Sequence, residues 1–139
     1  MKSKLPRVSR DGFLALAALV AVASAVGGEA RAESSLSGSW SGGGAFTLSS
    51  GAKEQARCRA NYTKAGGKRF LMSATCATSS ASVNQAATLV QTGANRYAGS
   101  FYNAEYGTGG SISVTVSGAS QSVRLSGAAG SGRFSLKKR

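Results

Sequence analysis

The sequence predicts an all-β fold: a single eight-stranded antiparallel barrel in which each strand pairs with the next one along the chain. Apolar and polar residues alternate in short runs that Gly, Ser and Asn interrupt at regular intervals. This pattern is typical of a β-sandwich or barrel, and no helical periodicity follows the N-terminal segment. Eight strands can close around side chains or one small ligand, and closure removes the exposed edges of a small sheet.

Eight alternating segments account for the strands. The connections between them are short, so neighbouring strands are expected to form an up-and-down meander. Only residues 104–110 (AEYGTGG) are long enough to form a loop with a shape of its own. The expected strands are residues 37–48, 53–63, 69–78, 82–91, 96–103, 111–117, 121–126 and 132–138.

The first 32 residues have the features of a secretory signal peptide. A positively charged start precedes an apolar run over residues 13–26 and a small-residue cleavage site, Ala30-Arg31-Ala32. The run is too short for an ordinary membrane-spanning helix. We therefore expect cleavage after Ala32, no transmembrane span thereafter, and a periplasmic or secreted domain of residues 33–139.

Both cysteines, Cys58 and Cys76, belong to the exported part, which predicts one disulfide. A turn at Gly67 places the two cysteines directly opposite each other on adjacent strands. The Cα separation of directly opposed residues suits a disulfide.

The last two hairpins are expected to continue one apolar stripe across three strands. In this register Val116 lies opposite Val123, and Leu125 lies opposite Phe134. The other face of these strands carries Ser, Thr, Arg and Lys. Because a transmembrane barrel needs an apolar exterior, the sequence favours a soluble barrel.

The segment Leu36-Ser37-Gly38-Ser39-Trp40 resembles the L-x-G-x-W start of lipocalin- and avidin-like barrels and of bacterial metalloprotease inhibitors. The stretches GSWSGGG, RCRA, NRYAGSFYN and GSGRFSL also look like small exported alphaproteobacterial proteins of unassigned function. The resemblance implies an eight-stranded barrel with Trp40 across its closed end. Inside it, large and small residues either fill the core or leave a pocket for an apolar ligand, and we favour the filled core.

The residue types present argue against catalysis. The chain has no His, so a triad with a His base is excluded. After residue 32 the only acidic residues are Glu33, Glu54 and Glu105, which are too scattered to predict a carboxylate pair. Two cysteines without His do not complete a metal site. We expect no enzyme activity, no metal and no cofactor.

A strongly basic exterior is the clearest signal beyond the fold. Cleavage of the signal peptide would remove five of the 17 Lys and Arg residues and two of the five acidic residues. Residues 33–139 would then carry a formal charge of +9. If the first strand joins both the second and the last, the basic groups share one side. That face would meet an anionic envelope component or an acidic protein, or it serves solubility alone. Nucleic acid is disfavoured because no aromatics interleave the cations. The candidate basic face is Arg57, Arg59, Arg124, Arg133, Lys137, Lys138 and Arg139.

The long connection is the second candidate surface, since long loops on rigid scaffolds often carry function. With the residues that lead into it, this connection would form a recognition loop over residues 101–110 (FYNAEYGTGG), or an ordinary connection whose aromatic residues cover the barrel mouth. The candidate residues at its tip are Tyr102, Asn103, Glu105 and Tyr106.

The sequence thus predicts a non-enzymatic binding module that uses the basic face or this loop. The alternatives are a periplasmic hydrolase inhibitor that inserts a loop or its tail over residues 33–36, and a carrier of a small apolar ligand. The oligomeric state stays open.

Overall fold

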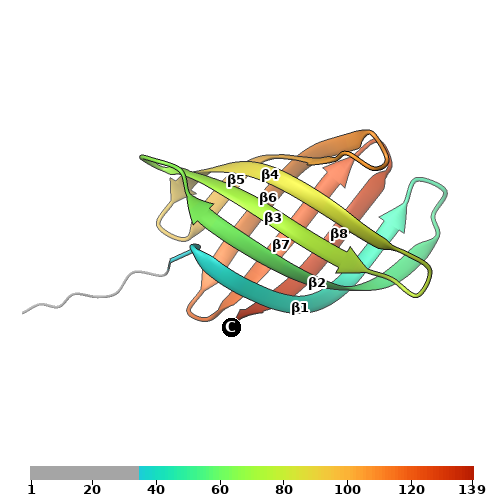
Figure 1. The fold of residues 1–139 in the computed structure, drawn as a ribbon, viewed down its shortest axis with the longest axis horizontal. Coiled ribbons are helices and arrows are strands. Elements are labelled where there is room, and N and C mark those ends of the chain that lie inside the picture. Colours follow the sequence, from blue (N-terminus) through green and yellow to red (C-terminus); the bar gives the residue numbers. More distant parts are fainter. Residues whose placement is uncertain (1–34) are drawn as a thin grey trace, which may run out of the picture. The chain divides into compact units, whose positions relative to one another are not determined.

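The computed structural model describes residues 35–139, so the signal peptide prediction lies outside the described residues. Within this range eight strands form a closed antiparallel barrel in which β1 pairs with both β2 and β8 (Figure 1). This confirms the predicted fold class and shows that the first strand closes on the last. No helix in the described range is long and apolar enough to cross a membrane. The strands are β1 (Gly38–Leu48), β2 (Lys53–Lys64), β3 (Arg69–Ala77), β4 (Ser82–Gly93), β5 (Arg96–Asn103), β6 (Thr108–Ser117), β7 (Ser120–Gly127) and β8 (Gly130–Lys138).

The strands alternate between buried and exposed residues, as the period of a β-strand requires. Their inward faces form one hydrophobic core, and their outward faces are mostly polar. The core includes Trp40, Tyr62, Phe70, Met72, Leu89, Tyr97, Ile112, Val114, Val116, Val123, Leu125, Phe134 and Leu136.

The predicted disulfide is confirmed. Cys58 on β2 lies directly opposite Cys76 on β3, with their Cα atoms 4.0 Å apart, and the two sulfurs are bonded. Both side chains are buried and point into the barrel. The crosslink therefore ties the β2–β3 hairpin together from the inside.

The register predicted for the last two hairpins is wrong by two residues. Val123 lies opposite both Val114 on β6 and Phe134 on β8, and the turns between these strands contain only two residues each. Gly118 has a φ of 59°, which suits the first position of such a tight turn. A shift by two keeps every side chain on its predicted face, so the apolar stripe survives.

The glycines that follow Trp40 are explained by close strand contacts. A Cβ on Gly42 would lie 2.1 Å from the Ser135 carbonyl oxygen, and one on Gly44 would lie 1.9 Å from that of Arg133. Both glycines occupy inward positions of β1 beside β8. Glycine lets the strand bend here, as barrel closure requires.

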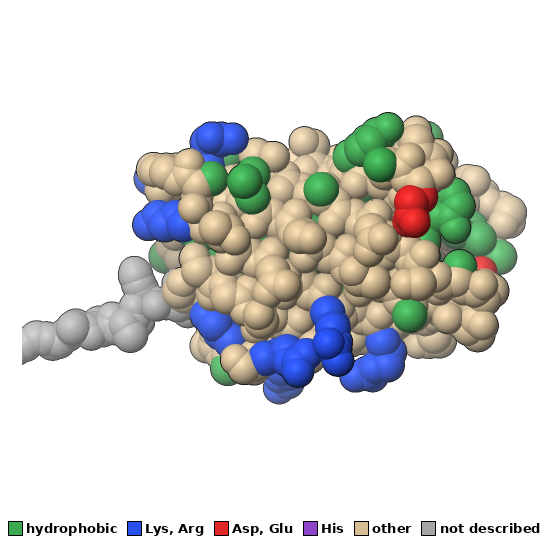
Figure 2. All heavy atoms as spheres, in the orientation of Figure 1, with side chains coloured by type: hydrophobic (Ala, Val, Ile, Leu, Met, Phe, Trp, Pro, Cys, Tyr) green, Lys and Arg blue, Asp and Glu red, His purple; other side chains and the backbone are tan. Residues whose placement is uncertain are grey.

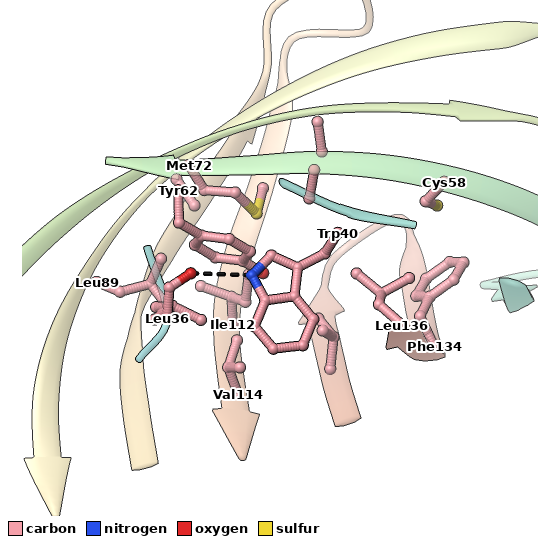
Figure 3. Close-up of a cluster of buried hydrophobic side chains, with 14 of the residues drawn as sticks. Leu36, Trp40, Cys58, Tyr62, Met72, Leu89, Ile112, Val114, Phe134 and Leu136 are labelled. Carbon is pink, nitrogen blue, oxygen red and sulfur yellow. Dashed lines mark hydrogen bonds between the residues drawn. The ribbon is translucent and has the colours of Figure 1, made fainter. Parts of the chain in front are cut away.

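Trp40 seals the end of the barrel at which β1 begins. Its side chain is fully buried, and its indole Nε1 donates a hydrogen bond to the Leu36 carbonyl oxygen at 2.9 Å. Figure 3 shows the indole ring between Leu36 and Tyr62 on one side and Leu136 on the other. Nearby, the Tyr62 hydroxyl donates to Gln121 Oε1 at 2.8 Å. Trp40 thus lies where the sequence predicts it, at the closed end.

Candidate functional site: the barrel mouth

The end of the barrel opposite Trp40 is hollow. A pocket of about 450 Å³ opens there, among the β1–β2, β3–β4, β5–β6 and β7–β8 turns. This volume lies within the range of small-molecule sites. The barrel is therefore hollow at this end, whereas the hydrophobic core fills the part of the interior nearer Trp40. The main lining side chains are Phe46, Leu48, Glu54, Val83, Gln85, Phe101, Asn103, Tyr106 and Leu125.

The pocket wall is mainly apolar and aromatic. The rings of Phe46 and Phe134 meet edge to face with centroids 5.0 Å apart, which fixes one side of the wall. Phe46, Val83 and Phe101 pack against the buried core yet stay partly exposed. An apolar body that fills the pocket would cover these three side chains.

Two polar side chains face into this wall without partners. Gln85 on β4 is only 9% exposed, and its amide makes no hydrogen bond with the described residues. Glu54 on β2 is half-buried, and its carboxylate forms no ion pair or hydrogen bond there. A few polar groups in an apolar cavity are what orient a bound small molecule.

A smaller cavity of about 30 Å³ lies deeper in the barrel, large enough for a water molecule. Gln85 and Leu125 line both this cavity and the mouth pocket. The disulfide and Met72 form part of its wall. Below it the core is closed by Tyr62 and Trp40.

The predicted recognition loop is shorter than expected, because residues 108–110 belong to β6 and only 104–107 form the turn. Asn103 is not at its tip: the residue is buried, and its Oδ1 accepts hydrogen bonds from the backbone N–H groups of Glu105 and Tyr106. Glu105 Oε1 accepts from the Asn84 backbone N–H. Tyr106 is 61% exposed and lines the mouth, whereas Tyr102 is exposed on β5.

The predicted basic residues gather largely as expected, because β1 lies between β2 and β8. Outward residues of β1 are small: Ser41 sits between Arg59 and Lys137. Figure 2 shows the resulting band of Lys and Arg along the lower edge of the barrel. Arg124 on β7 lies directly opposite Arg133 on β8.

Three of these residues converge on one depression. Arg57, Arg59 and Arg139 line a surface hollow of about 480 Å³ together with Ser41 and Thr75. No salt bridge joins any two of the described residues, so these guanidinium groups have no carboxylate partner there.

Lys138 does not belong with this outward face. Its ammonium Nζ lies 5.2 Å from the centre of the Trp40 ring and donates to the Ser35 carbonyl oxygen at 3.0 Å. The register places it opposite Trp40 at the closed end. Lys138 therefore helps to hold the plug in place.

Sequence reasoning missed the two polar groups in the mouth, Glu54 and Gln85, although a signal was present. Both occupy inward positions of an alternating strand, in phase with Ala56 and Ala87. A polar residue that interrupts an inward apolar series points to a cavity or a buried hydrogen bond. The structure places these two in a cavity.

The fold and the mouth together define a closed eight-stranded antiparallel barrel that is plugged at one end and hollow at the other. No protein family model matches the chain, and no curated protein matches it. Two solved barrels are similar in fold. A redesigned β-barrel, mFAP1, bound to DFHBI, superposes with a TM-score of 0.61 at 9% identity, over 75% of this chain and 94% of that one. A de novo designed fluorescence-activating β-barrel gives a TM-score of 0.58 at 13% identity over the same shares.

Proposed function

We propose that this protein is a non-enzymatic binding module that holds a small, largely apolar molecule in the barrel mouth. One observation carries the proposal: a pocket of about 450 Å³ with aromatic walls, into which the unpartnered amide of Gln85, only 9% exposed, projects. The amide of Gln85 makes no hydrogen bond with the described residues, so it can bond with a polar group of a ligand and orient that ligand in the pocket. The similar fold of a barrel bound to DFHBI is compatible with this use of the scaffold.

Filling the mouth tests the proposal. Val83 lines the pocket from β4, whereas Val90 on the same strand is 43% exposed on the outside. We expect an uncharged solvatochromic naphthalene dye to bind saturably to the native protein. Val83→Trp should abolish binding, and the matched control Val90→Trp should leave it unchanged. Equal binding to both variants, or none to the native protein, would refute the site.

A second candidate function is contact with an anionic envelope component or an acidic protein through the basic face. Its specific support is the facing pair Arg124 and Arg133, since like charges directly opposite each other destabilise a sheet. No carboxylate of the described residues neutralises this pair, so an anionic partner that binds here would relieve the repulsion between the two arginines.

Binding to anionic vesicles at low and moderate salt tests the second candidate. Arg57→Ser/Arg59→Ser should weaken binding more than Lys68→Ser/Arg96→Ser, which removes equal charge elsewhere on the barrel. Equal losses would mean that only net charge matters.

The inhibitor alternative gains less support. Leu36, one of the tail residues expected to insert into a hydrolase, is fully buried beneath Trp40 and accepts its hydrogen bond. Inserting Leu36 into a hydrolase would remove it from the core and break its hydrogen bond with Trp40. An inhibitory contact would instead have to use a loop.

A further inference from the structure

Within residues 35–139 the side-chain carboxylates collect at the mouth. The described residues contain twelve Lys and Arg but only two acidic residues, Glu54 and Glu105. Glu54 lines the pocket, Glu105 lies in the adjacent β5–β6 turn, and none of the described lining residues is Lys or Arg. In Figure 2 the acidic side chains in view lie at the right-hand end, beside exposed hydrophobic side chains. Lys53 directly precedes Glu54, but it is exposed and does not line the pocket. The charge on the pocket lining therefore has the opposite sign to the net charge.

Glu54 is held toward the pocket by the strand that carries it. It occupies an inward position of β2, in phase with the buried Ala56 and opposite Phe46 on β1. Its carboxylate is half-buried and has no ion pair or hydrogen bond with the described residues. A carboxylate that has no ion pair attracts a cation that comes close to it. A cationic group in the pocket would therefore pair with Glu54.

The rest of the pocket suits the body of such a ligand. Phe46, Phe101 and Tyr106 present aromatic rings to the cavity, and the faces of aromatic rings attract organic cations. Gln85 adds an amide carbonyl that can accept a hydrogen bond from an N–H group. Apolar contact, ring faces and one carboxylate together match one ligand chemistry.

We infer that the pocket binds an apolar organic cation, a compact aromatic or aliphatic amine whose ammonium group lies beside Glu54. The inference rests on the proposed function, because it assigns a charge to the ligand of the same pocket. The cations nearest to Glu54 along β2 are Lys53, which directly precedes it, and Arg57, three residues or about 10 Å further along the strand. Both are exposed and neither lines the pocket, so 0.15 M salt, which screens charges over about 8 Å, weakens their repulsion of a cationic ligand.

Three probes of one shape test the ligand charge: a naphthyl group that carries a methylammonium, a hydroxymethyl or a carboxylate substituent. Their dissociation constants for the mature, oxidised protein are measured by calorimetry in 0.15 M salt. The cation should bind about tenfold more tightly than the neutral alcohol, and the carboxylate should bind most weakly. Glu54→Gln should remove the preference and leave the alcohol unchanged. Glu105→Gln, which removes the same charge outside the pocket, should keep most of it.

The outcomes separate this inference from the function on which it rests. If cation and alcohol bind equally to the native protein, or if Glu54→Gln leaves the preference intact, the charge assignment is wrong while the pocket stands. If Glu105→Gln removes the preference as fully as Glu54→Gln, the selectivity comes from the summed negative charge at the mouth. The placement of the ammonium group beside Glu54 is then wrong. If no probe binds, the pocket and the inference both fail.

Discussion

Reduction of the disulfide should cost this barrel a large part of its stability. Cys58 and Cys76 are 18 residues apart, and their bond closes a loop of that length around the β2–β3 hairpin. The chain-entropy model gives about 3 kcal/mol for such a loop. Small domains are stable by only about 5–15 kcal/mol, so the reduced barrel would keep a modest margin at room temperature.

The comparison is best made on one protein, oxidised and fully reduced, with urea unfolding followed by circular dichroism. The free energy of unfolding should fall by about 3 kcal/mol, and Tm should fall by about 12 °C or more. Cys58→Ala/Cys76→Ala serves as a second reduced state that cannot reoxidise. A loss below about 1 kcal/mol in both would refute the argument from loop entropy.

Three further predictions concern the plug, the buried tyrosine and the basic face. Trp40→Ala should destabilise the barrel by about 3–5 kcal/mol in thermal unfolding, because it leaves a large cavity; a loss below about 1 kcal/mol would show that Trp40 is not a packed plug. Burial raises the pKa of Tyr62, so the hydroxyl ionises in the unfolded chain first and the free energy of unfolding should fall as pH rises above about 10. Urea titrations at about pH 9 and about pH 11 should show a smaller fall in Tyr62→Phe, and equal falls would contradict this origin. Arg124→Thr should stabilise the barrel by about 0.2–1 kcal/mol at low salt by relieving repulsion with Arg133, and the gain should vanish in about 1 M NaCl; a gain that persists in salt would have another cause.

The sequence predicted those parts of the fold that depend on the alternation of side chains. The positions of Cys58 and Cys76 predicted the register of β2 and β3, because only one pairing of these two strands places the cysteines directly opposite each other. The Val- and Ser-rich strands near the C-terminus offer no such marker. A shift by two residues, as between Val114 and Val116 opposite Val123, preserves every face. The register there is set by turn length, which alternation does not encode.

Glycine was the main source of error around the mouth. Gly109 and Gly110 suggested a loop, yet both lie in β6, where a Cβ would come within 2.4 Å of a carbonyl oxygen on the adjacent strand. Glycine serves turns and close strand contacts equally well, and composition does not separate the two uses. The pocket was equally hidden, because its volume depends on how the closed barrel places Phe46 and Phe101.

The pairing of β1 with β8 has a consequence for how the molecule is made. Trp40 lies opposite Lys138, so the closing contact joins residues near the two ends of the described chain. During synthesis β1 and β7 each keep an unpaired edge until the nine residues of β8 are available, and pairing over such a separation is slow. A chain stopped within those nine residues would remain an open sheet, whose two free edges are templates for pairing with other chains.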